Sequence, residues 1–283
     1  MIGTCTRTIG SCDNYTGKTG LRMRIGIIGN GAIAHYVCDK AAEYGHEVVA
    51  QLLRPTHFAE SSNDKVLYIS AVADLPESVE HVVDCAGHSA LRDYGPEILR
   101  GGRSLTTVSI GALADATLFE SLAQAAREGE SRLHLASGAI GALDCLRAAK
   151  IGELHDVSYI GRKPPHSWKG SPAESKVDLD NLTSGEFIHF EGSARDAATE
   201  YPKNANVAAA VALAGIGFDG TQVRLIADAG VTENIHEIHA SGEFGSFSFE
   251  IRGHSLAENP RSSALAAMSV ISQLEQVSQQ VTF

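Results

Sequence analysis

The stretch Arg24–Ala34, RIGIIGNGAIA, constrains the fold more than any other part of this sequence. Its first half is an uninterrupted apolar run, which is typical of a parallel strand buried on both faces. A turn with Gly29 and Gly31 follows at once, and apolar side chains then recur at helical spacing up to Tyr44. A buried strand, a glycine turn and a helix in this order predict the opening unit of an α/β fold.

The alternation of strands and helices continues to about residue 136. The expected strands are residues 23–29, 46–53, 66–72, 81–87, 104–110 and 131–137, and the expected helices are 32–44, 90–102 and 114–129. Such alternation predicts a Rossmann-type, doubly wound parallel sheet. We place this dinucleotide-binding domain at residues 22–138, after a flexible leader at residues 1–21.

The pattern changes in residues 139–259, which we expect to form the second domain. The expected elements are a bridging helix at 137–152, a strand at 156–165, a loop at 167–175, a helix at 204–218, and strands at 222–231, 233–244 and 245–256. They predict a smaller α+β domain on an open, mostly antiparallel sheet, with a hairpin turn near Gly242–Gly245. A last amphipathic helix, residues 260–283, has Pro260 in its first turn and is expected to pack back on the first domain.

Composition narrows the class of protein. The net charge of -11 over 283 residues argues against nucleic-acid binding, which normally requires a basic face. No apolar run reaches the roughly 18 residues of a membrane span, and the N-terminal residues lack the apolar core of a secretory signal. The five cysteines lack C-x-x-C spacing, so neither a disulfide framework nor a metal site is indicated. A cytoplasmic enzyme without a membrane partner is expected.

The glycine turn fits a dinucleotide. Gly29 permits the tight turn, Gly31 lets the backbone approach a pyrophosphate, and the helix that starts at Ala32 and Ile33 directs its N-terminus at the anion. Ala34 replaces the third glycine of the usual pattern, where only a small side chain is needed for packing.

Two further segments are expected beside the cofactor. The second strand ends in QLLRP without a carboxylate for the ribose, and Arg54 could instead accept a 2'-phosphate or face solvent. Past the fourth strand, Cys85, Ala86 and Gly87 should lie near the cofactor, because ligands bind beyond the carboxyl ends of such strands. The sequence thus predicts a nicotinamide cofactor and leaves NAD and NADP both open.

Candidates for proton transfer come from histidines. In ENIHEIHAS, His236 and Ile238 share one face of a strand, whereas His239 points to the other. One of the two histidines should face the domain interface, although a structural role is the ordinary alternative. His88 competes with both, because it follows the fourth strand of the cofactor domain.

Amide and basic side chains complete the set of candidates. Asn206 in YPKNANVAAA could hold the nicotinamide carboxamide or serve only as a helix cap, beside Lys203. A cationic substrate pocket could be formed by Arg162, Lys163 and Arg261, for each of which a solvated surface position is the alternative.

Together these motifs resemble the L-aspartate dehydrogenases. The resemblance rests on GNGAIA, SGAIGALD, GRKPP, KNANVA, NIHEI and ENPRSSAL, in this order, and it extends from about residue 23 onward. It implies a two-domain enzyme that uses NAD or NADP, often as a homodimer, with His236 as the catalytic histidine. It also implies cofactor contacts at Ala139 and Asn206.

The implied reaction converts L-aspartate and water to oxaloacetate and ammonia through iminoaspartate, which can feed NAD biosynthesis. Our hypothesis gives His236 the role of general acid/base, because an imidazole titrates near pH 6.5. Lys163, Lys203 and Arg162 are expected to hold the substrate carboxylates. The rival interpretations are an NADPH-dependent reductase of another imine or oxo acid, and a non-catalytic NAD(H)-sensing protein.

Overall fold

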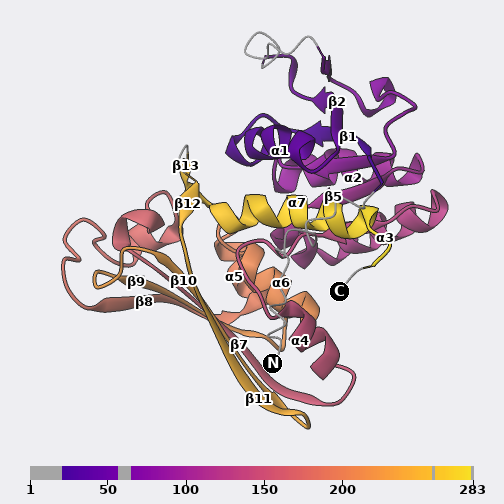
Figure 1. Cartoon of the computed structure of the whole chain (residues 1–283). Helices are drawn as coiled ribbons and strands as arrows, with labels where there is room; N and C mark the ends of the chain where they lie inside the picture. The colour runs from indigo at the N-terminus through magenta and orange to yellow at the C-terminus, as the bar shows by residue number, and fades with distance from the viewer. Residues whose placement is uncertain (1–20, 57–64, 257–258, 282–283) are drawn as a thin grey trace, which may run out of the picture.

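The computed structural model describes residues 21–56, 65–256 and 259–281. Its two larger sheets have helices between them (Figure 1). The first sheet has six parallel strands in the order β3-β2-β1-β4-β5-β6. These strands are β1 (Arg24–Ile28), β2 (Glu47–Leu52), β3 (Leu67–Ile69), β4 (His81–Asp84), β5 (Ser104–Thr107) and β6 (Leu133–Leu135). This order confirms the Rossmann-type prediction.

Helices connect the parallel strands. They are α1 (Ala32–Glu43), α2 (His88–Arg100) and α3 (Ala116–Glu128), with 3₁₀ turns η2 (Val72–Asp74) and η3 (Ile110–Ala114). The expected start of the third helix is confirmed, since the Asp115 carboxylate accepts hydrogen bonds from the backbone N–H groups of Thr117 and Leu118.

The second sheet has five strands in the order β11-β10-β7-β9-β8. They are β7 (Leu154–Lys163), β8 (Glu186–Ser193), β9 (Gln222–Asp228), β10 (Asn234–Gly242) and β11 (Gly245–Gly253). Only the β7–β9 pair is parallel, so the prediction of a mostly antiparallel sheet is confirmed. The expected hairpin joins β10 to β11, with Gly242 paired to Gly245.

Three short helices lie between the second sheet and the C-terminal helix (Figure 1). They are α4 (Leu143–Ala149), α5 (Ala194–Glu200) and α6 (Asn206–Ala214). α6 is apolar on all sides, NVAAAVALA, and its small side chains are almost all buried. It packs against both α5 and η3, so it joins the second sheet to the loops of the first.

Some elements differ from the prediction. β8 and α5 were not expected, and the loop at 167–175 contains two 3₁₀ turns, η4 (Pro165–Trp168) and η5 (Pro172–Ser175). The last helix, α7 (Ala264–Ser278), begins later than predicted, because β13 (Asn259–Ser263) pairs with β12 (Ser255–Leu256). Strand pairing therefore outweighs the tendency of Pro260 to start a helix. The side chains of Pro260 and Arg261 lie outside the described residues.

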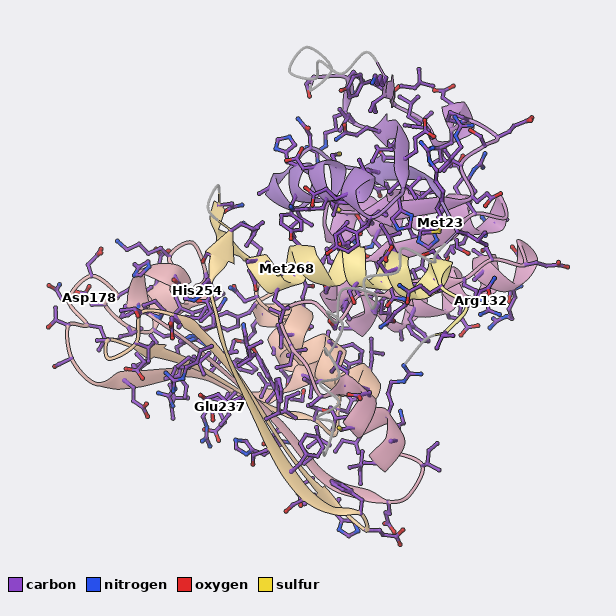
Figure 2. The ribbon with its side chains drawn as sticks, in the orientation of Figure 1. Met23, Arg132, Asp178, Glu237, His254 and Met268 are labelled. Carbon is purple, nitrogen blue, oxygen red and sulfur yellow. The ribbon has the colours of Figure 1, made fainter. Side chains whose placement is uncertain are left out.

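α7 packs on the parallel sheet. Its Val270, Ile271 and Leu274 share a buried cluster with residues of β1 and α1. At its far end, Glu275 lies 3.0 Å from His46 Nε2. Figure 2 shows Met268, from the exposed side of α7, between the two sheets. The C-terminal helix is thus part of the core of the first domain.

Candidate active site

A pocket opens at the carboxyl ends of β1, β2 and β4. It has a volume of about 390 Å³, and Gly29, Gly31, Arg54, Cys85 and Ala86 are among its lining residues. These strand ends are where open parallel sheets bind ligands. Five of the ten residues that the sequence predicts to bind the cofactor therefore line one pocket.

The glycine turn packs closely against the loop after β4 at Gly29 and leaves open space beside Gly31. Gly29 has a φ of 105°, and a Cβ at this position would lie 2.9 Å from the Cβ of Ala86. α1 follows with Ala32 and Ile33 as its first residues, and its N-cap Gly31 supplies no side-chain capping bond. The first N–H groups of α1 therefore remain available to an anion such as a pyrophosphate.

The loop after β4, residues 85–87, is fixed by a buried carboxylate. Asp84, fully buried at the end of β4, accepts hydrogen bonds from the Thr107 and Ser109 hydroxyls at 2.7 Å and from Ala86 N–H at 3.0 Å. Burial raises the pKa of Asp84. Gly87 then begins α2 as its N-cap, with a φ of 97°. The polar partners of Asp84 fix the Cys85–Gly87 turn beside the pocket.

Asn206 joins the two domains. Its Oδ1 atom accepts the backbone N–H of Gly111 at 2.9 Å and lies 2.9 Å from His88 Nε2. Because Gly111 N–H can only donate, the amide orientation is fixed and the Nδ2 group is directed away from η3. A Cβ at Gly111 would lie 2.8 Å from His88 Cε1 and 3.0 Å from Asn206 Oδ1. In this structure His88, a candidate for proton transfer, donates its Nε2–H group to the Asn206 side chain.

His236 is buried on the helix-facing side of the second sheet. It is 5% exposed, and its Nδ1 atom lies 2.7 Å from the Tyr159 hydroxyl. Burial, with a smaller contribution from Lys163, lowers the pKa of His236 to about 3. His239 is exposed on the other face, where it contacts Ser248 at 2.9 Å. The predicted alternation of the two histidines is confirmed, and His236 is the buried one.

The two adjacent basic residues of β7 lie on opposite faces. Lys163 shares the face of Gly161, the partner of His236 across the strands. Its ammonium lies 4.9 Å from the centre of the Trp168 ring, and burial lowers its pKa to about 8. Arg162 instead pairs with Glu186 and with Asp228.

Arg162 is therefore separated from the buried histidine. Its other neighbour is Glu237, 3.9 Å away, which Figure 2 shows on the side of the sheet that faces away from the helices. Of the remaining predicted residues, Ala139 is buried after β6, and Lys203 is exposed in the turn before α6. The structure brings Lys163 and His236 together but leaves Arg162 among carboxylates on the opposite face.

Sequence reasoning missed Tyr159 and Trp168, the direct neighbours of His236 and Lys163. The available signal was the alternation Tyr159, Gly161, Lys163, which places all three on one strand face. Asp84 was also missed, although it directly precedes the predicted Cys85–Gly87 segment.

The residues present fit a nicotinamide dinucleotide. A glycine turn at a free helix N-terminus suits the pyrophosphate, and a neutral histidine beside a cation on the second sheet suits a charged substrate. Fold and site together define a two-domain, nicotinamide-dependent oxidoreductase.

Comparison with known proteins narrows this class. Residues 144–277 match the family described as aspartate dehydrogenase, C-terminal, and residues 25–136 match the NAD-binding domain of homoserine dehydrogenase. An L-aspartate dehydrogenase from Ruegeria pomeroyi is 52% identical over 91% of this chain and 93% of its own length. One from Cupriavidus necator is 42% identical over 88% of this chain and 95% of its own. The chain belongs to the L-aspartate dehydrogenase family.

Solved structures agree with this assignment. The crystal structure of aspartate dehydrogenase from Thermotoga maritima superposes with a TM-score of 0.74 at 26% identity, covering 93% of this chain and all of the other. A dihydrodipicolinate reductase from Paenisporosarcina, at 14% identity and a TM-score of 0.54, shares the fold alone. Among the described helices, none is both long and apolar enough to cross a membrane.

Proposed function

We propose that this protein catalyses the reversible, NAD(P)-dependent oxidative deamination of L-aspartate to oxaloacetate and ammonia. Family membership supports the substrate and the reaction class. The observation that carries the proposal is the location of the neutral His236 and the cationic Lys163 on the same face of the second sheet. A dicarboxylic amino acid requires a cation for a carboxylate and a group that can exchange a proton at the α-carbon substituents.

The cofactor is proposed to bind between the two domains. Gly29, Gly31 and the start of α1 hold the pyrophosphate, and Arg54 lies where it can contact the adenosine ribose or its phosphate. Ala139 and the Nδ2 group of Asn206 face the nicotinamide end. When bound, the nicotinamide supplies the hydride acceptor for the α-carbon.

The substrate is proposed to bind against the second sheet. Lys163 pairs with a carboxylate, and exposed Lys203 adds a second cation at the entrance to α6. Arg162 has no part in this pocket, because its guanidinium already pairs with Glu186 and Asp228. His236 is the catalytic residue, since a neutral imidazole can donate a hydrogen bond to the oxygen or nitrogen at the reacting carbon.

One assay tests this proposal. NADH and NADPH oxidation are followed with oxaloacetate in the presence and absence of ammonium, and then with other oxo acids. Ammonium-dependent oxidation that is selective for oxaloacetate is expected. Oxidation without ammonium would instead indicate a reductase of an oxo acid, and cofactor binding without turnover would indicate a sensor.

The catalytic assignment has its own test. His236→Ala is expected to lower kcat by about 10²- to 10⁴-fold. His239→Ala is the matched control, because it removes a histidine of the same strand from the exposed face. Near-normal turnover of a folded His236→Ala protein would contradict the assignment.

We also propose a cytoplasmic homodimer. None of the described helices covers the open side of the second sheet, which leaves a broad face for a second copy (Figure 1). Light scattering coupled to gel filtration should give twice the 29.9 kDa chain mass. In the cell, release of iminoaspartate would connect the reaction to NAD biosynthesis.

A further inference from the structure

The protonation pattern of His236 follows from its partner. The Tyr159 hydroxyl touches Nδ1 at 2.7 Å, and no other acceptor for this hydroxyl is found in the part of the chain that the structure describes. Tyr159 is only 2% exposed, so water offers no ready alternative. A buried O–H group without an acceptor is destabilising, and the hydroxyl proton is therefore directed at Nδ1.

An Nδ1 atom that accepts a hydrogen bond carries no proton, so the neutral ring must carry its proton on Nε2. Two features keep the system in this form. Burial raises the pKa of the Tyr159 phenol, which remains a donor. Burial and the Lys163 charge lower the pKa of His236 to about 3, which keeps the ring neutral.

The backbone opposite His236 makes this contact possible. Gly161 pairs with His236 across β7 and β10, and a Cβ at Gly161 would lie 2.7 Å from the Tyr159 hydroxyl oxygen. The absence of a side chain therefore lets Tyr159 extend along its own strand to reach Nδ1. Nε2 has no partner among the described residues and is not one of the fully enclosed polar atoms, which leaves it for the substrate.

We propose that Tyr159 is a positioning residue that holds His236 as its Nε2–H tautomer, so that this histidine meets the substrate as a hydrogen-bond donor. The inference rests on the proposed function and deepens it. A neutral imidazole in this form can polarise a carbonyl. Its N–H fits the oxygen on the α-carbon of oxaloacetate and of the carbinolamine formed with ammonia. It does not fit an α-ammonium group, so aspartate must react as its free amine.

The tautomer can be measured directly by nitrogen NMR on the full chain with labelled histidine and bound NADH. His236→Gln identifies the signals by their loss. A protonated Nε2 and an unprotonated Nδ1 are expected at neutral pH. A protonated Nδ1 would overturn the proposal, and this measurement needs no variant of Tyr159.

Tyr159→Phe removes only the hydroxyl. We expect a mixture of His236 tautomers, a fall of about tenfold in kcat for ammonium-dependent NADH oxidation, and an unchanged KM for NADH. Gly161→Ala should give the same changes by displacing the hydroxyl. Unchanged tautomer signals and kcat in Tyr159→Phe would refute the proposal.

Tyr201→Phe is the matched control, since the Tyr201 hydroxyl also lies against a histidine Nδ1, that of His189, at 3.0 Å. It should leave the His236 signals unchanged; a shift of these signals equal to that in Tyr159→Phe would refute a specific role for Tyr159. If the wild type shows no ammonium-dependent activity, the proposed function fails, whereas the tautomer measurement still decides this inference.

Discussion

Two substitutions at Asn206 separate its structural role from its proposed role in cofactor binding. Asn206→Ala removes the oxygen that accepts hydrogen bonds from Gly111 N–H and His88 Nε2. One lost hydrogen bond and one buried donor left without a partner together cost about 2 kcal/mol. For a chain of this size, that corresponds to a fall in Tm of about 3–4 °C.

Asn206→Asp keeps an oxygen for both donors but replaces the Nδ2 donor with a second acceptor. Its Tm should therefore stay within about 2 °C of the wild type. Its affinity for NADH should fall by about 10- to 100-fold, because a carboxylate faces the carboxamide oxygen where an N–H group had donated.

Thermal unfolding of the protein without cofactor gives the first quantity, and titration calorimetry with NADH gives the second. Asn204→Ala, two residues earlier in the same turn, is the control for general disturbance of the start of α6. The reasoning is refuted if Asn206→Asp binds NADH as tightly as the wild type, or if it loses as much stability as Asn206→Ala.

Three further outcomes are expected. In fluorescence titrations, Arg54→Ala should lower the affinity for NADPH about tenfold and leave the affinity for NADH unchanged, because only NADPH offers a 2'-phosphate to the guanidinium. An equal loss of affinity for both cofactors would show that Arg54 does not contact the 2'-phosphate. In steady-state kinetics, KM for oxaloacetate should rise as the pH increases through about 8, because Lys163 loses its charge there. Lys163→Met should raise KM at pH 7 and abolish the dependence of KM on pH. Burial lowers the pKa values of His81, His189 and His236 to about 3, 4 and 3, so the unfolded chain binds protons below pH 6.5 that the folded chain does not. The urea concentration at the unfolding midpoint should therefore decrease as the pH is lowered from 6.5 to 4. This decrease should be smaller in His81→Gln, and a midpoint that does not change with pH would contradict these pKa values.

The sequence was most informative where function depends on local spacing. The glycine turn predicted the parallel sheet and its strand-end pocket, because both follow from one strand–turn–helix unit. Strand alternation correctly placed His236 and Ile238 on one face and His239 on the other. These features depend on residues close together in the chain, where periodicity is a physical property of the backbone.

The rest depends on pairing between distant segments. Arg162 and Lys163 were grouped by charge, although neighbours in a strand point to opposite faces. The carboxylates that hold Arg162 come from β8 and β9, and β8 itself was not predicted. The Tyr159–His236 contact likewise joins residues 77 positions apart. Sequence periodicity carries no information about such partners, since they are set by strand order.

The position of α7 has a consequence for how this protein is made. Because its apolar side chains fill a cluster with Ile25, Ile27 and Val37, the cofactor domain is built from segments far apart in the sequence. While the protein is being synthesised, the parallel strands emerge first but must wait for α7 to cover them. During that interval a chaperone has an apolar surface to bind, and a ribosome that stalls before α7 would leave a nascent cofactor domain open to proteases.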